Sequence, residues 1–165
     1  MKRIIVAVLV LLLPPNVGAQ TPLPWPSVAM GQIYLPFGTE WFQEGARDRV
    51  TGFGEPECSP ETCRWMADRA EGTVFLTQSY HAGTLVGFRL DYTLTRESGA
   101  PYLEKVRELR ERMGEEWVVT SLLDPLSTAV VPEEDFRAES KDTRIQVTYR
   151  EGEHAVTVTL DIQAK

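Results

Sequence analysis

Alternation of apolar and polar residues predicts strands in several parts of the chain. The clearest case is the run TLVGFRLDYTLT at residues 84–95, in which every second residue would face a core: Val86, Phe88, Leu90, Tyr92 and Leu94. The preceding run TVFLTQSY, residues 73–80, is separated from it by His81, Ala82 and Gly83, which suits a tight hairpin. We expect a sheet with one face on the core and one face mainly in water.

The same period of two predicts a second hairpin at the C-terminal end. Residues 144–150 and 154–162 alternate, and the turn falls at Glu151 and Gly152. Thr157, Thr159 and Asp161 would face water. A short strand is expected around Ile33 and Leu35, whereas the charged segment PEEDFRAESKD, residues 132–142, is interpreted as a solvated loop.

A helical spacing of apolar residues appears twice. Over residues 39–51, with Thr39 as the capping residue, the expected buried stripe consists of Phe42, Ala46, Val50 and Phe53. Over residues 101–113, with Pro101 in the first turn and Gly114 as the stop, the stripe consists of Tyr102, Val106, Leu109 and Met113.

These elements together predict an α+β fold, an antiparallel sheet with two helices packed on one face. The two helices superpose at an offset of 60 residues, with Phe42 on Tyr102 and Ala46 on Val106. We therefore expect a single domain over residues 29–165 with tandem helix-plus-sheet halves at 29–95 and 96–165.

The first residues have the pattern of a secretory signal peptide, residues 1–19. Lys2 and Arg3 precede an apolar run, and the small residues up to Ala19 predict cleavage between Ala19 and Gln20. The apolar run is about half of the roughly 20 residues that a membrane-spanning helix needs. No cysteine follows it for lipid attachment, so we expect a periplasmic or secreted protein with no stable membrane anchor in the mature chain.

The segment after the expected cleavage site, residues 20–28, has three prolines around Leu23 and Trp25. It cannot form a helix and is expected to be an extended arm. Two alternatives are open: a loose terminus, or an arm that docks through Trp25 on a partner or on its own domain.

The charge of the chain limits the class of partner. The formal net charge is -7, and removal of Lys2 and Arg3 would leave 15 basic against 24 acidic residues, a net charge of -9. An acidic surface repels phosphate backbones and anionic headgroups. We expect a protein partner in the envelope or outside the cell, and no nucleic acid.

Both cysteines lie in the stretch GEPECSPETCRW, where Cys58 and Cys63 are separated by four residues. An exported protein meets an oxidising compartment, so a disulfide that fixes this loop is the favoured interpretation. A redox switch or a metal site are the weaker alternatives, because the spacing matches neither. The loop with Trp65, Tyr80 and His81 is a candidate recognition loop.

The chain contains no combination of residues that specifies catalysis. His81 follows Ser79 and Tyr80, but neighbouring strand residues point to opposite faces, and His154 adjoins a charged turn. The acids Glu133, Glu134 and Asp135 lack the spacing of a calcium loop. We expect no enzyme, no catalytic residues, no cofactor and no metal.

The run FGTEWFQEGARDRVTGFGEP, residues 37–56, resembles the opening of small bacterial envelope proteins of the β-lactamase-inhibitor and outer-membrane-assembly lipoprotein type. The resemblance implies an envelope-exposed binding module, although the lipoprotein branch would carry a lipidated cysteine that this chain lacks. The expected function is therefore an exported, non-catalytic protein-binding module. The alternatives are a carrier of small apolar ligands and an uncharacterised hydrolase.

Overall fold

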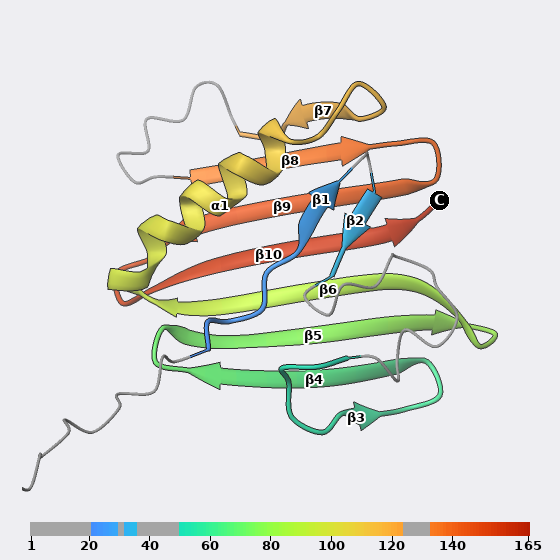
Figure 1. The fold of residues 1–165 in the computed structure, drawn as a ribbon, viewed down its shortest axis with the longest axis horizontal. Coiled ribbons are helices and arrows are strands. Elements are labelled where there is room, and N and C mark those ends of the chain that lie inside the picture. Colours follow the sequence, from blue (N-terminus) through green and yellow to red (C-terminus); the bar gives the residue numbers. More distant parts are fainter. Residues whose placement is uncertain (1–20, 30–31, 36–49, 124–132) are drawn as a thin grey trace, which may run out of the picture.

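The computed structural model describes residues 21–29, 32–35 and 50–123 together with 133–165. Its main feature is one eight-stranded antiparallel sheet with the strand order β3-β4-β5-β6-β10-β9-β8-β7 (Figure 1). The strands of this sheet are β3 (Glu57–Cys58), β4 (Thr62–Arg69), β5 (Gly72–His81), β6 (Thr84–Thr95), β7 (Val118–Ser121), β8 (Glu133–Glu139), β9 (Thr143–Glu151) and β10 (Ala155–Ala164).

One face of this sheet is covered by two elements (Figure 1). They are the helix α1 (Gly99–Glu111), which follows the short 3-10 turn η2 (Arg96–Ser98), and a small hairpin of β1 (Ser27–Ala29) and β2 (Gln32–Tyr34). Their apolar residues join those of the sheet in a single core cluster.

The predicted α+β fold with two helices on one face is wrong. Strands make up 56% of the described residues, and α1 is the one α-helix among them. The helix predicted over 39–51 lies outside the described residues except for its last two positions. The prediction missed the β1–β2 hairpin, which covers the sheet beside α1. Val28 and Ile33 of this hairpin are buried, at 8% and 4% exposure.

The strand order consists of two four-stranded meanders that meet at the centre of the sheet. β3 to β6 form one meander and β7 to β10 the other, and β6 pairs with β10 from Thr95↔Ala155 to Gly87↔Gln163. Tandem halves would give this order. The repeat of 29–95 and 96–165 stays a prediction.

The predicted strand over 84–95 is confirmed as β6. Its residues Phe88, Leu90, Tyr92 and Leu94 are each at most 1% exposed. The preceding turn is a two-residue connection, with positive φ at Ala82 (47°) and Gly83 (79°), as a type I′ hairpin requires. The second predicted helical stripe is confirmed as well, since Tyr102, Val106, Leu109 and Met113 of the α1 segment are buried.

Within the segment 132–142, which the sequence predicts to be a solvated loop, residues Glu133–Glu139 form the strand β8. Phe136 and Ala138 are fully buried, while Asp135 and Arg137 lie on the opposite face. This strand has two buried apolar residues, and charged residues surround them. The alternation of apolar and polar positions is therefore too short to recognise in the sequence. β4 follows the same rule, with Cys63, Trp65 and Ala67 buried at every second position.

The proline-rich arm docks on its own domain. Leu23 is 2% exposed, and the Trp25 ring packs against Tyr92 and Tyr102 with centroids 5.3 and 5.6 Å apart. The Tyr92 hydroxyl donates a hydrogen bond to the Pro24 carbonyl oxygen at 2.5 Å. Of the two alternatives for this arm, the structure therefore has the docked form.

Candidate functional site

The face of the sheet that points away from α1 is the candidate site, and we call it the open face. It consists of the alternate residues of β4, β5, β6, β10, β9 and β8 that do not enter the core. Strand register aligns these residues in rows across the sheet, for example Arg64, Thr77, Arg89, Asp161, Gln146 and Arg137. No described element covers this face.

At the centre of the open face, Arg89 and Asp91 form an ion pair. The Nε atom of Arg89 lies 3.0 and 2.9 Å from the two carboxylate oxygens of Asp91, and the hydroxyl of Thr159 donates to Asp91 Oδ1 at 3.0 Å. Because the Arg89 side chain is 53% exposed, this pair contributes at most about 1 kcal/mol to stability. Its main effect is to hold a guanidinium and a carboxylate in fixed positions on the surface.

Two adjoining depressions, of about 320 and 350 Å³, flank this pair. Both are open to solvent, and both include Arg89 and Asp161 in their walls. Gly87 lies in one of them, where an added Cβ would make only ordinary contacts with Ser79 and with the carbonyl oxygen of Ile162. The linings are rich in hydroxyl, amide and charged groups, which suits hydrogen bonding to a polar partner.

The β4 end of the open face is cationic and apolar. The guanidinium carbon of Arg64 lies 4.0 Å from the centroid of the Phe75 ring, a cation–π contact. Met66 is opposite Phe75 in the register and is 50% exposed. This corner offers a partner an exposed thioether and a positively charged group on an aromatic ring.

The β8 end of the open face contains two buried polar atoms for which the described residues provide no hydrogen-bond partner, Asp135 Oδ1 and Arg137 Nε. Next to them, Glu139 is paired with Lys165 at 2.8 Å and with Arg144 at 3.1 Å. The hydrogen bond from Lys165, followed by the two positive charges, lowers the pKa of Glu139. This end therefore contains charged side chains whose hydrogen-bonding atoms are not all paired by the described residues.

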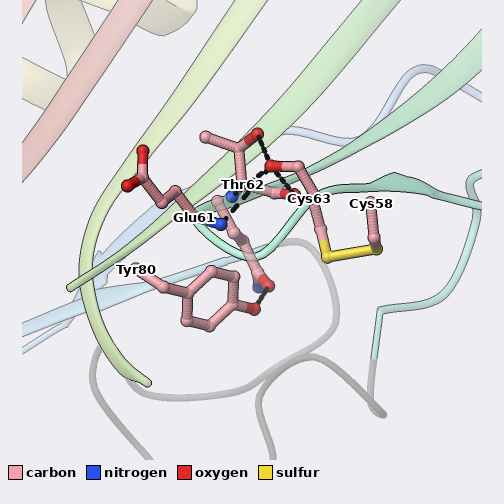
Figure 2. The surroundings of a disulfide bond; sticks show 7 residues. Cys58, Glu61, Thr62, Cys63 and Tyr80 are labelled. Atoms are coloured by element: carbon pink, nitrogen blue, oxygen red, sulfur yellow. Dashed lines mark hydrogen bonds between the residues drawn. A yellow bond between two sulfur atoms is a disulfide. The ribbon is translucent and has the colours of Figure 1, made fainter. Parts of the chain in front are cut away.

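The cysteines form the predicted disulfide, which joins β3 to β4 at one edge of the sheet (Figure 2). Cys63 is 1% exposed, and the turn between the cysteines is held by a hydrogen bond from the Ser59 amide to the Thr62 carbonyl at 2.7 Å. The Tyr80 amide donates to the Glu61 carbonyl at 2.7 Å, which ties this turn to β5. The disulfide thus fixes the loop as expected.

The three residues of the candidate recognition loop do not share one surface. Trp65 is 3% exposed and belongs to the core, so it is not available to a partner. Tyr80 is half-buried and its hydroxyl donates to Gln78 Oε1, and His81 is exposed at the β5–β6 turn. The predicted cleavage residues Ala19 and Gln20 lie outside the described residues.

The open face is harder to predict from the sequence than the disulfide is. Alternation placed Arg89, Asp91 and Asp161 on the wet side of their strands, but register across the sheet was needed to show that they gather in one place. His81 and His154 are both exposed at hairpin turns. Among the described residues, no three His, Cys, Asp or Glu side chains are placed to hold a metal ion together.

Comparison of the chain with protein-family models, with curated proteins and with solved structures finds no match. Within the described part of the chain, no helix is long and apolar enough to cross a membrane. The site therefore has to be interpreted from its own geometry.

Proposed function

We propose that the protein is an exported, non-catalytic protein-binding module of the bacterial cell envelope and that it docks its partner on the open face. The observation that carries the proposal is the contrast between the two faces of the sheet. One face is closed by α1 and the β1–β2 hairpin, and the other presents six strands of aligned polar side chains with no described element over them.

The composition of the open face supports a protein partner. Protein interfaces combine arginine, exposed apolar groups and fixed hydrogen-bonding groups. The open face has Arg64 on Phe75, exposed Met66, and Asp91 already held by two neighbours. Groups that are held in place before binding lose less conformational freedom when the partner docks.

The openness and the lining of the two depressions favour this proposal over a carrier of small apolar ligands. A carrier would enclose its ligand in a mainly apolar cavity, whereas both depressions are open to solvent; one is lined by polar residues, and the other combines polar residues with Val86, Phe88 and Ala164. The resemblance to envelope modules and the secretory pattern of residues 1–19 point to the compartment, and both stay predictions.

Position-specific photo-crosslinking in cells tests the docking surface. A photoreactive residue at Thr93 or Thr157, both on the open face, should capture the same discrete protein, and Arg89→Ala should reduce that capture at least tenfold. Glu108 and Glu111, exposed on α1, are the control positions. Capture from α1 with none from the open face would refute the docking surface, and an intact mass that reveals a bound small molecule in place of a crosslink would favour the carrier.

Export is tested separately by N-terminal sequencing of the protein recovered from the periplasm or the medium. We expect the mature chain to begin at Gln20. Recovery of the protein only in the cytoplasm, beginning at Met1, would contradict the proposal whatever the crosslinking shows.

A further inference from the structure

The two edges of the large sheet are protected very differently. An exposed strand edge presents unpaired main-chain groups that invite another strand, and proteins normally cover such edges. The outer edge of β4 is covered by residues 54–58, through the disulfide, the β3 pairing and a hydrogen bond from the Gly54 amide to the Met66 carbonyl at 2.8 Å. The opposite edge is β7, to which none of these protections applies.

The outward side of β7 can be assigned from the hydrogen-bond pattern. The Leu122 amide donates to the Asp135 carbonyl of β8 at 2.8 Å, so alternate residues of β7 bond to β8. The main-chain groups of Val119 and Ser121 therefore point away from the sheet. Among the described residues these groups have no hydrogen-bond partner.

β7 and the two residues that follow it contain three of the four large apolar side chains that the described residues expose. Val118 is 70% exposed, Leu122 is 37% exposed and the neighbouring Leu123 is 36% exposed; the fourth such residue is Met66 on the open face. Val118, Thr120 and Leu122 project on the open-face side of the edge, beside a depression of about 470 Å³. A strand edge that no described residue covers and that has apolar side chains along it is a site for strand addition.

From this edge we infer that the protein forms a symmetric dimer in which β7 pairs antiparallel with β7 of a second copy, about an axis through Thr120. In this register Val118 of each copy lies opposite Leu122 of the other, and Thr120 lies opposite its own counterpart. The outward groups of Val119 then bond to those of Ser121, as an antiparallel ladder requires. If the axis passed through Val119 or Ser121 instead, the outward groups would still pair. Val118 and Leu122 would then lie opposite threonine or a charged residue, so the register through Thr120 is preferred.

The area of the contact predicts a weak dimer. Four strand residues on each side fall short of the roughly 1,200 Å² that stable interfaces bury. Both copies also carry a net charge of -7 or more negative, so they repel one another at low salt. The dimer should therefore be reversible, visible only at high protein concentration, and strengthened by added salt. This inference does not depend on the proposed function, because it uses the edge of the sheet and leaves the centre of the open face free.

Sedimentation equilibrium of the mature protein tests the inference, from about 10 μM to about 1 mM, where weak contacts become populated. We expect a monomer–dimer equilibrium that tightens with salt. Val118→Lys and Leu122→Lys should each weaken it at least tenfold, because each apolar pair occurs twice in the dimer. Met66→Lys, which changes an exposed apolar residue elsewhere, is the matched control and should leave it unchanged. A monomer at every concentration, or a dimer indifferent to Val118→Lys, would overturn the inference.

A cysteine at the symmetry axis tests the register. Residues opposite one another in a non-hydrogen-bonded pair have Cα atoms about 4.5 Å apart, within disulfide range. The native Cys58–Cys63 bond joins such a pair, with a Cα–Cα distance of 4.1 Å. Thr120→Cys should therefore form a covalent dimer under mild oxidation, whereas Thr93→Cys, exposed at the centre of the open face, should not. Equal crosslinking of the two variants, or of neither, would exclude the axis through Thr120.

Discussion

The Tyr102 hydroxyl of α1 donates a hydrogen bond to Glu71 Oε1 at 3.0 Å, across 31 residues of sequence. The same carboxylate oxygen accepts a hydrogen bond from the main-chain amide of Leu23. One side chain in the β4–β5 turn thus fastens both α1 and the N-terminal arm to the sheet. Within the arm, the Trp25 ring is tilted against Tyr92 at 46° and meets Tyr102 edge to face at 81°.

Glu71→Ala should destabilise the protein by about 2 kcal/mol, because it leaves two partly buried donors without an acceptor. The loss should appear in urea unfolding, and amide exchange should become faster at residues 23–28. Glu97→Ala, a change at an exposed acid in η2, is the control and should stay within about 0.5 kcal/mol. If the two variants were equally stable, Glu71 would not fasten the arm.

Two tyrosines should make the fold sensitive to alkali. Burial, aided by the neighbouring Glu71, raises the pKa of both Tyr92 and Tyr102 above the usual value of 10.0. Since the neutral forms are favoured only in the folded state, their contribution to stability is complete below pH 10 and falls as the pH rises above it. Each such tyrosine should lower the free energy of unfolding by up to about 1.4 kcal/mol per pH unit.

The measurement is urea unfolding at a series of pH values above 10, compared between the native chain and Tyr102→Phe. The variant should lose less stability per pH unit, whatever its stability at neutral pH. Parallel curves for the two proteins would contradict the raised pKa of Tyr102.

Removal of the disulfide should cost about 2 kcal/mol, the chain-entropy value for so short a loop. The double change Cys58→Ala and Cys63→Ala is suitable because it leaves no free thiol. Amide exchange should rise in residues 54–66 and stay unchanged in β9 and β10. Global unfolding on reduction would show that the bond does more than fix one edge.

Gly72→Ala should be among the most destabilising single changes, at about 2 to 4 kcal/mol. Gly72 has a φ of 146°, and an added Cβ would lie 2.3 Å from the Thr93 carbonyl oxygen and 2.8 Å from the Leu94 Cα. Both are backbone atoms of β6, so they cannot move away as the end of a flexible side chain could. Gly54→Ala, whose Cβ would meet only the Met66 carbonyl oxygen at 3.5 Å, is the control and should be nearly neutral in thermal unfolding.

Elements with a strong period could be predicted from the sequence, and elements held by tertiary contacts could not. The strand at 84–95 and the helix at 99–111 each contain at least four apolar residues at the correct spacing. β8 has Phe136 and Ala138 alone among charges, and β1 is a strand because it pairs with β2. The expected α+β class with two helices is wrong because strands make up 56% of the described residues, and strands such as β8 and β1 lack a recognisable period.

The site was harder to predict than the fold. The cysteine spacing and the expected oxidising compartment predict the disulfide. The sequence does not show that Trp65 lies in a strand, and for this reason the expected recognition loop includes it. The open face depends on which strands become neighbours, and that information is not local. Arg89 and Asp161 are 72 residues apart in sequence, yet they lie opposite one another in the register.

The pairing of β6 with β10 determines when the sheet can be completed during folding. β10 follows every other described strand in sequence, but it occupies the middle of the sheet, between β6 and β9. Until residues 155–164 have joined the sheet, β6 therefore has no inner neighbour. The core can close only after β10 has paired with both β6 and β9, and a chain that ended at residue 154 would lose the centre of its sheet rather than a frayed end.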